Sequence, residues 1–449
     1  MDINMLLLFL LLLLFGSQAN HFFGTVMTFT PKDKTHNGSL TVVFHYKLSF
    51  RSCTDQDTWS CVSGDCGSES VELSIVDEED KEWCQREGVM TREVSSNAVF
   101  QLRLDGGDWI QNKNKVKKWR ALTNVDLRTR LDTYQPNKSP QTTILPALRV
   151  PSNCQRVFSL SAFDPDGDKV KCRFGDIDAD ECNPCTPPSV LTISQACTLS
   201  FNPVSRQDEG SYAVQLEMED FPKKTVIISD YGVQTNITPS EALSKIPIRF
   251  ALMVDPPAPS CSEGVYLPRF LPPTPANGAR MYTNDTVNIT IVAEATNATV
   301  LKLLFSGPHS VVKHTESHGE FILTWTPSEN QDGEDHPICF LVQAEKDTAK
   351  YQSELRCVIV SYRTEPVITT SMPTTVLPST TPASTTTVTE TETLSITTVV
   401  ADESKASGDD SSRAGKIAGA VCGAVGVAAI VGIVVWVVRG SPHAFYKVV

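Results

Sequence analysis

The sequence is poor in basic residues. Its 449 residues include 39 lysines and arginines against 52 aspartates and glutamates, which gives a net charge of −13 and an isoelectric point near 5.2. Nucleic acids and anionic surfaces repel a chain of this charge. We therefore expect no nucleic-acid partner, although acidity alone identifies no other partner.

The sequence also lacks the common catalytic motifs. It contains no G-x-S-x-G, P-loop, dinucleotide fingerprint or kinase set. Cys182 and Cys185 have the spacing of a thioredoxin motif or a zinc half-site, but no βαβ pattern surrounds them. His314 and His318 enclose Glu316 and do not form H-E-x-x-H. We predict that the chain is not an enzyme, while the dispersed catalytic residues of an ectoenzyme would escape a motif search.

Two uncharged apolar runs lie near the chain ends. Residues 5–15, followed by Ser17-Gln18-Ala19, predict a signal peptide over residues 1–19, although Asp2 replaces the usual basic residue. Its run of about eleven residues is too short to cross a ~30 Å hydrocarbon layer. Residues 417–438 hold 22 uncharged residues, roughly 33 Å of helix, and predict a transmembrane helix. The predicted topology is type I single-pass, with residues 439–449 as a cytoplasmic tail.

Two short patterns lie in and after the predicted membrane helix. Gly415, Gly419 and Gly423 recur every four residues, a spacing that lets two helices approach closely and permits a homodimer. Glycine is also common in lone transmembrane helices. Tyr446 and Val449 fit a Tyr-x-x-apolar sorting signal, whose place in a very short tail resembles lysosome-associated membrane glycoproteins. That resemblance implies endosomal or lysosomal membrane residence as the alternative to the plasma membrane.

Residues 363–413 are predicted to form a mucin-like stalk. Between residues 364 and 400, 19 of 37 residues are Ser or Thr, and four prolines interrupt them. Such a segment buries too little apolar surface to fold. Dense O-glycosylation is the favoured interpretation and a bare linker the alternative, and in both cases the segment is a spacer.

Twelve of the thirteen cysteines lie between residues 20 and 362, an even number that predicts six disulfides in an oxidising compartment. They are Cys53, Cys61, Cys66, Cys84, Cys154, Cys172, Cys182, Cys185, Cys197, Cys261, Cys339 and Cys357. Residues 150–255 hold five of them and residues 256–362 hold three, so at least one bridge joins these segments if all are oxidised. Cys339 and Cys357 are expected on adjacent strands and to pair, whereas the other connectivities stay open.

The same region carries six N-x-S/T sequons, each of which predicts an exposed and glycosylated asparagine. They are Asn37, Asn137, Asn236, Asn284, Asn288 and Asn297. Pro140 directly follows the sequon of Asn137 and makes it the weakest of the six.

The folded part is predicted to be all-β. Aromatic and apolar residues alternate with polar ones over residues 44–50, which is the period of a half-buried strand. Asn37-Gly38 separates this run from residues 24–30 and predicts a hairpin. Residues 157–174 align with 287–305, and residues 199–220 with 323–345, as two copies of an internal repeat. We predict an N-terminal β domain (20–149) and two β-sandwiches (150–255 and 256–362).

The motif order of the repeat resembles a known type. A-x-D-P-D-G-D-x-V at residues 162–170, L-x-F-x-P at 199–203 and G-x-Y-x-V-x-L-x-x-x-D at 210–220 resemble cadherin-like and bacterial-type immunoglobulin-like repeats of surface proteins. Residues 21–29 are similar to an N-terminal β module that precedes such repeats. The resemblance implies a sandwich fold for residues 150–362 and is weak evidence for any one function.

The acidic turn in this motif is a candidate calcium site. Asp164, Asp166 and Asp168 place carboxylates at alternate positions, as a hard cation needs, but the spacing is not that of an EF-hand. The resemblance to cadherin-like repeats implies that acids near the domain end, here Asp220 and Asp255, complete such a site. The alternative is a solvated turn, because Asp, Pro and Gly form turns for local reasons.

Residues 113–120 form a basic cluster, Lys-Asn-Lys-Val-Lys-Lys-Trp-Arg, that matches the short pattern of heparin-binding loops. A solvated hairpin tip is the favoured interpretation of this cluster.

Taken together, the sequence predicts a type I cell-surface glycoprotein that acts in adhesion or recognition, with an extracellular protein or glycan as ligand. The alternative is a mucin-like protective or endolysosomally sorted glycoprotein, in which the stalk and the glycans are the function. The sequence does not identify the ligand.

Overall fold

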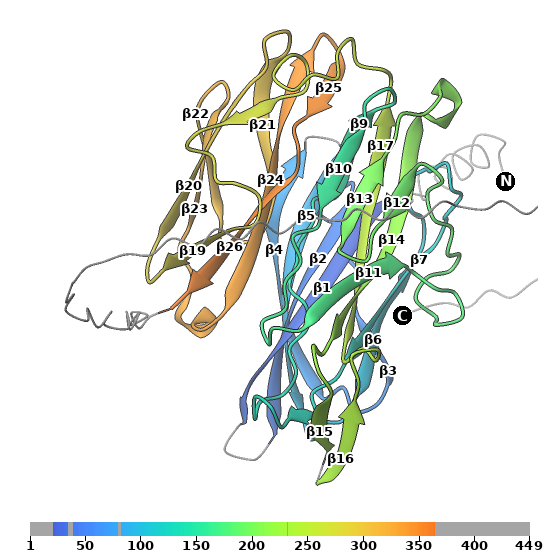
Figure 1. The fold of residues 1–449 in the computed structure, drawn as a ribbon, viewed down its shortest axis with the longest axis vertical. Coiled ribbons are helices and arrows are strands. Elements are labelled where there is room, and N and C mark those ends of the chain that lie inside the picture. The colour runs from blue at the N-terminus through green and yellow to red at the C-terminus, as the bar shows by residue number, and fades with distance from the viewer. Residues whose placement is uncertain (1–20, 35–38, 80–81, 231, 364–449) are drawn as a thin grey trace, which may run out of the picture. The chain divides into compact units, whose positions relative to one another are not determined.

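The computed structural model describes residues 21–34, 39–79, 82–230 and 232–363. Within these ranges the chain is all-β, as predicted, with 26 strands in five sheets and two short 3-10 helices (Figure 1). None of the described residues belongs to a helix long and apolar enough to cross a membrane. The predicted signal peptide, the stalk from residue 364, the transmembrane helix and the tail lie outside the described residues.

The first group of strands covers residues 22–130. It comprises β1 (Phe22–Lys34), β2 (Leu40–Phe50), β3 (Ser60–Ser63), β4 (Ser68–Glu79), β5 (Trp83–Val94), β6 (Phe100–Gly106), β7 (Trp119–Val125) and β8 (Thr129–Arg130). β1 and β2 form the predicted antiparallel hairpin, in which Thr28 lies opposite His45. The expected turn residues Asn37 and Gly38 lie outside the described residues.

The second group covers residues 147–255. It comprises β9 (Ala147–Pro151), β10 (Arg156–Ser159), β11 (Lys169–Phe174), β12 (Leu191–Ile193), β13 (Thr198–Phe201), η1 (Arg206–Asp208), β14 (Gly210–Phe221), β15 (Val226–Asp230), β16 (Val233–Ile237) and β17 (Lys245–Asp255). β15 and β16 form a hairpin that pairs with β8 as a small separate sheet.

The third group covers residues 269–362 and forms a sandwich of two sheets. It comprises β18 (Arg269–Leu271), β19 (Ala279–Thr283), β20 (Val287–Glu294), β21 (Thr299–Ser306), β22 (Val312–Ser317), β23 (Glu320–Trp325), η2 (Glu329–Gln331), β24 (Asp335–Lys346), β25 (Ala349–Gln352) and β26 (Arg356–Tyr362). Ile289, Phe305 and Trp325 are at most 1% exposed and belong to its core.

The largest sheet is continuous across the boundary that the sequence predicts between residues 149 and 150. β17 pairs with β14 on one edge, while β9, β1 and β7 follow one another along its other edge. Gly24 permits the close approach of β1, since a Cβ there would lie 2.0 Å from the carbonyl oxygen of Arg249. The predicted boundary falls inside β9, and strands on both sides of it share one sheet and one hydrophobic core.

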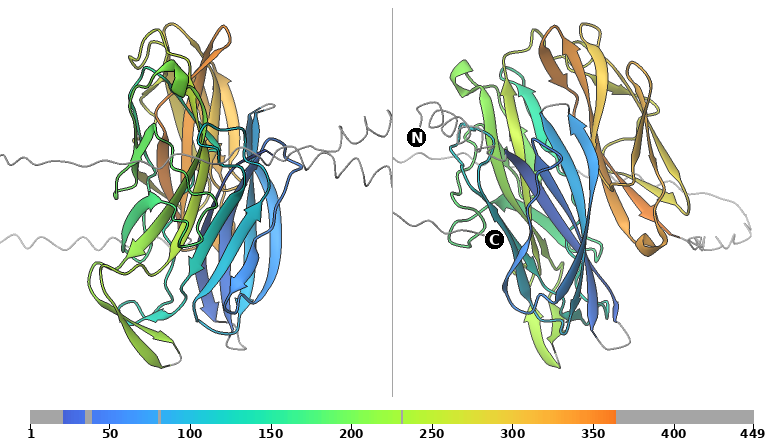
Figure 2. Two further views of the ribbon diagram at one scale, coloured as in Figure 1. Left: turned by 90° about the vertical axis from the view of Figure 1, so that its right-hand side faces the viewer. Right: turned by 180° about the vertical axis from the view of Figure 1, so that it is seen from behind.

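The internal repeat is visible in the strand pairing. β11, β14, β17 and β9 pair in that order, with β9 parallel to β17. β21, β24, β26 and β19 pair in the same order, with β19 parallel to β26. A 3-10 helix precedes both β14 and β24. The yellow and orange strands of the second copy lie beside the blue strands of the first group in all views (Figure 2).

Candidate functional site

The structure joins all twelve cysteines of its described residues in six disulfides. They are Cys53–Cys84, Cys61–Cys66, Cys154–Cys261, Cys172–Cys197, Cys182–Cys185 and Cys339–Cys357. Cys154–Cys261 is the bridge between residues 150–255 and 256–362 that cysteine parity predicts, and Cys339–Cys357 is the pair expected on adjacent strands. Six disulfides indicate an extracellular or secreted location for this part of the chain.

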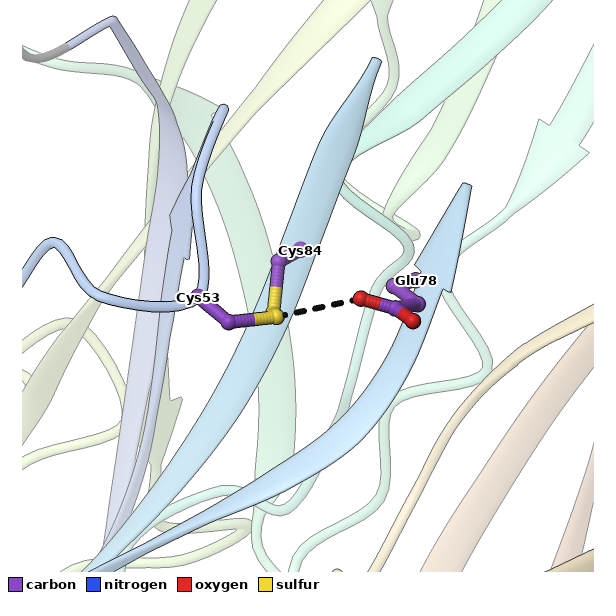
Figure 3. A group of neighbouring side chains, drawn as sticks. All are labelled: Cys53, Glu78 and Cys84. Atoms are coloured by element: carbon purple, nitrogen blue, oxygen red, sulfur yellow. Dashed lines mark hydrogen bonds between the residues drawn. A yellow bond between two sulfur atoms is a disulfide. The ribbon is translucent and has the colours of Figure 1, made fainter. Parts of the chain in front are cut away.

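One group of potential metal ligands converges among the described residues. The ligand atoms of Cys53, Glu78 and Cys84 lie within 4.8 Å of one another (Figure 3). The two cysteines are bonded to each other, so neither sulfur is a thiolate that could bind a metal. Glu78 Oε2 lies 3.2 Å from Cys53 Sγ, which has no hydrogen to donate. This group is therefore a structural disulfide beside a carboxylate.

The acidic turn is organised around the buried guanidinium of Arg130. Arg130 is 1% exposed, and both its terminal nitrogens donate to the carboxylate of Asp168. Its Nη1 also lies 3.9 Å from Asp166 Oδ2. Asp164 Oδ1 accepts hydrogen bonds from the backbone amides of residues 166 and 168 at 2.9 and 3.0 Å, which shapes the turn. The cation within this turn is a protein side chain.

The five acids predicted for calcium do not converge on one point. Asp220 joins the turn indirectly, because its Oδ2 accepts a hydrogen bond from Asn137 Nδ2 at 2.9 Å, and Asn137 Oδ1 accepts one from Arg130. Asp255 lies elsewhere and accepts from Arg149 at 3.0 Å. Calcium binding stays a prediction. A calcium ion would compete with Arg130 for the carboxylates of the acidic turn.

Burial raises the pKa of two carboxyl groups of this network. Burial, followed by the nearby charge of Asp220, raises the pKa of Asp164 to about 8. Burial raises the pKa of Asp220 to about 7, against the opposing effect of its hydrogen bonds from Ser244 and Asn137. Asp164 Oδ2 has no hydrogen-bond partner among the described residues. The network is therefore short of positive charge despite Arg130.

The predicted glycosylation sites separate into two classes. Four asparagines are exposed, as predicted: Asn236, Asn284, Asn288 and Asn297. The prediction of an exposed Asn137 is wrong, because this side chain is 0% exposed and both its amide atoms are hydrogen-bonded within the Arg130 network. Ser139 of the same sequon is also buried. Asn37 lies outside the described residues.

Acidic residues of the first group meet basic residues of the last sandwich. Asp77 Oδ1 accepts from Lys313 Nζ at 2.6 Å, and Asp77 Oδ2 accepts from the amide of Phe305 at 3.0 Å. Glu79 Oε1 accepts from Lys302 and Lys350, both at 2.9 Å. These pairs, together with Cys154–Cys261, fix the joint between the two parts of the chain.

Glu87 is the centre of the most buried part of this joint. Its carboxylate accepts from Lys47 Nζ at 2.7 Å and from the backbone amide of His309 at 2.7 Å, and it contacts both His309 Nδ1 and His45 Nδ1. Burial alone would raise the pKa of Glu87, but Lys47 and the histidine contacts hold it well below its usual range. Lys47 also donates to the carbonyl of Gly307 at 2.6 Å and so spans the joint.

A polar groove of about 450 Å³ opens at this joint. Strands β1, β2, β4 and β5 form one wall, and residues 309–310 and 326–334 of the sandwich form the other. Six of its polar residues are Lys32, His45, Glu72, His309, Asn330 and Gln331. Sequence reasoning missed this groove, because residues such as Glu87 and His309, 222 positions apart, meet only through the tertiary fold.

The other predicted features divide between surface positions and undescribed residues. His314 and His318 are exposed on and after β22 and do not form a site with a third ligand among the described residues. The predicted homodimer residues Gly415, Gly419 and Gly423 lie outside the described residues. The sorting residues Tyr446 and Val449 also lie outside them.

No protein-family model matches the sequence, and no curated protein matches it either. Among solved structures, the chain is similar to tandem immunoglobulin repeats of Dlar, with 13% identity over 50% of this chain and 95% of that one, at a TM-score of 0.19. It is also similar to repeats EC1-2 of human protocadherin-24, with 11% identity over 51% of this chain and 99% of that one, at a TM-score of 0.16.

A further similarity is to an endo-fucoidan hydrolase, MfFcnA4, of glycoside hydrolase family 107. The identity is 14% and the TM-score 0.18, and the match covers 68% of this chain. The chain spans 38% of the length of that hydrolase. The matches to immunoglobulin-like, cadherin and hydrolase chains are all distant, and scores this low define neither a shared topology nor a shared activity.

Proposed function

We propose that this chain is a type I single-pass cell-surface glycoprotein that acts in adhesion or recognition through its β-sandwich ectodomain. The observation that carries the proposal is the polar groove of about 450 Å³ at the joint of the first sheet and the last sandwich. Ligand sites occur preferentially at such joints between structural modules.

The joint gives the groove a fixed shape. Cys154–Cys261 closes a loop of 107 residues, and ion pairs of Asp77 with Lys313 and of Glu79 with Lys302 cross the joint. Glu87 also contacts His309 across it. A preorganised groove binds a partner without the cost of ordering its own walls. The mixture of amide, hydroxyl, imidazole and charged groups suits an extracellular protein or glycan partner.

The exposed sequons support the same assignment. Asn236, Asn284, Asn288 and Asn297 are at the surface, and none of them is among the residues that line the groove. Glycans at these positions would shield the outer faces and leave the groove open. The stalk and the membrane helix, proposed from the sequence, would hold the ectodomain away from the membrane.

A cell-mixing assay tests the proposal. Non-adhesive cells that display the full chain are mixed with unlabelled cells, with and without a calcium chelator. We expect aggregates that contain displaying cells in both conditions, because the guanidinium of Arg130 already places a positive charge beside the acidic turn. Dispersed cells despite surface staining would favour the mucin-like protective alternative, and staining confined to endosomes would favour the sorted glycoprotein.

A further inference from the structure

The loop between β6 and β7 is held by side-chain hydrogen bonds and carries four exposed lysines. Asn112 Nδ2 donates to the carbonyls of Ile110 and Val116 at 2.8 and 2.7 Å, and its Oδ1 accepts from the Val116 amide at 2.9 Å. Asn114 Nδ2 donates to the carbonyl of Ala213 at 2.8 Å, which ties the loop to β14. The loop conformation is therefore set by inward-pointing side chains.

The lysines alternate with these inward side chains. Lys113, Lys115, Lys117 and Lys118 are exposed, and none of them forms an ion pair among the described residues. The neighbouring Arg120, in contrast, is paired with Asp105 and Asp180. In a chain of net charge −13, four such cations within residues 113–118 form a local concentration of positive charge. Lys113 Nζ donates to the carbonyl of Gln207 at 2.7 Å, a neutral partner that leaves its charge in place. No carboxylate therefore neutralises the positive charge of the four lysines.

The backbone of the loop is held in an unusual conformation at Lys115. Its φ is 61°, in the left-handed region that lysine seldom occupies. Asparagine or glycine would be easier to accommodate there. The position therefore carries a lysine at a conformational cost, and such costs are concentrated at functional sites.

A surface depression of about 420 Å³ continues the basic surface next to the loop. Arg51 and Lys113 contribute to its rim, and no aspartate or glutamate is among the residues that line it. The stem of Lys113 lies over Gly210, where an added Cβ would be 3.2 Å from Lys113 Cδ. The glycine thus makes room for the lysine at the edge of the depression.

We propose that this basic surface, Arg51 with Lys113, Lys115, Lys117 and Lys118, binds a sulfated polysaccharide. A polyanion with a repeating negative charge needs several unpaired cations along one loop, and lysines act as point charges that tolerate varied sulfation patterns. An anionic membrane is a poorer fit, because the apolar side chains of the loop point inward and leave no anchor for a bilayer. The inference goes beyond the proposed function, since this surface is separate from the groove.

The test uses the full chain on cells and fluorescent heparin as the probe. The loop variant is Lys113→Gln, Lys115→Asn, Lys117→Gln and Lys118→Gln, in which asparagine suits the left-handed position. A control variant removes four exposed lysines elsewhere: Lys169→Gln, Lys223→Gln, Lys224→Gln and Lys346→Gln. Each lysine near a polyanionic surface is worth on the order of fivefold in affinity. We expect the heparin affinity of the loop variant to fall by about twentyfold or more, and that of the control variant to change little.

Three further measurements identify the chemical class of the ligand. Heparin stripped of its sulfates should not bind, and 0.5 M salt, at which the screening length is about 4 Å, should release heparin. Vesicles containing phosphatidylserine should bind much more weakly than heparin at equal charge. Equal heparin binding by wild type and loop variant at equal surface display would overturn the proposal, and so would stronger binding of the vesicles. Heparin binding and cell adhesion are measured in separate assays. A failure of heparin binding is therefore distinguishable from a failure of groove-mediated adhesion.

Discussion

Replacement of Arg130 by methionine should destabilise the protein strongly. Methionine keeps an apolar stem of similar length but removes the guanidinium that donates to Asp168, Asp132 and Asn137. Arg130 is 1% exposed and the side chains of Asp166 and Asp168 are 5% and 4% exposed. The substitution therefore leaves buried carboxylates without their cation.

The expected loss follows from the geometry of these charges. Two unit charges about 4 Å apart interact by about 4 kcal/mol in a partly buried site. Removal of one partner from a buried ion pair typically costs about 3 to 5 kcal/mol. We therefore expect the free energy of unfolding to fall by about 4 kcal/mol at pH 7. The loss should shrink toward pH 5, because the pKa of Asp166 is already raised by burial and loses the opposing effect of Arg130.

Urea unfolding of the purified protein at pH 7 and pH 5 measures this loss. Arg269→Met is the matched control, because Arg269 and Glu294 form an exposed pair, 54% and 43% exposed, which is worth less than about 1 kcal/mol. Millimolar calcium should raise the melting temperature of Arg130→Met more than that of the wild type, since the carboxylates are then free. The prediction is wrong if the two variants lose the same free energy of unfolding relative to the wild type, or if the loss in Arg130→Met is larger at pH 5 than at pH 7.

Three further predictions follow from the bridges, the joint and the sequons. Replacement of Cys154 and Cys261 by serine should lower the free energy of unfolding, measured in urea, by about 5 kcal/mol, because this bridge closes a loop of 107 residues. Replacement of Cys182 and Cys185, which are only 3 residues apart, should lower it by about 2 kcal/mol. The pKa of Glu334, about 2, lies below its unfolded value of 4.5, so its contribution to stability is present above pH 4.5 and lost as the pH falls toward 2. Glu334→Gln should remove that part of the acid sensitivity in thermal melts, and an unchanged pH profile would contradict it. Asn288→Gln should lower the glycoprotein mass by one N-glycan, whereas Asn137→Gln should not change glycan mass, a result that mass spectrometry checks directly.

Much of the local fold could be predicted from the sequence, because it depends on short-range patterns. The alternation over residues 44–50 predicts β2, and the motifs of residues 150–362 predict two copies of one strand order. Cysteine parity predicts a bridge between residues 150–255 and 256–362, which is Cys154–Cys261. These features depend on residue spacing within a strand or on the number of cysteines in each segment, so they can be predicted without knowledge of tertiary contacts.

The features that were missed depend on contacts between distant residues. The predicted domain boundary at residue 149 does not capture the shared sheet, in which β1 pairs with β17 at Thr25 and Arg249, 224 positions apart. Asn137 has the sequence of an exposed sequon, yet its amide is hydrogen-bonded to Asp220, 83 positions away. The groove likewise has no local signal, since its two walls come from opposite ends of the described chain.

The most direct test of the account is to place a glycan in the groove. Asp332→Thr creates a sequon at the exposed Asn330, which lines the groove, while Lys346→Asn creates one in the exposed β24–β25 turn at the other end of β24. Both variants are displayed on cells at equal density and compared with the wild type in the mixing assay. Recognition through the groove predicts that Asp332→Thr disperses the cells and Lys346→Asn does not. Adhesion of Asp332→Thr cells at the wild-type level, with the new glycan confirmed by mass, would contradict it.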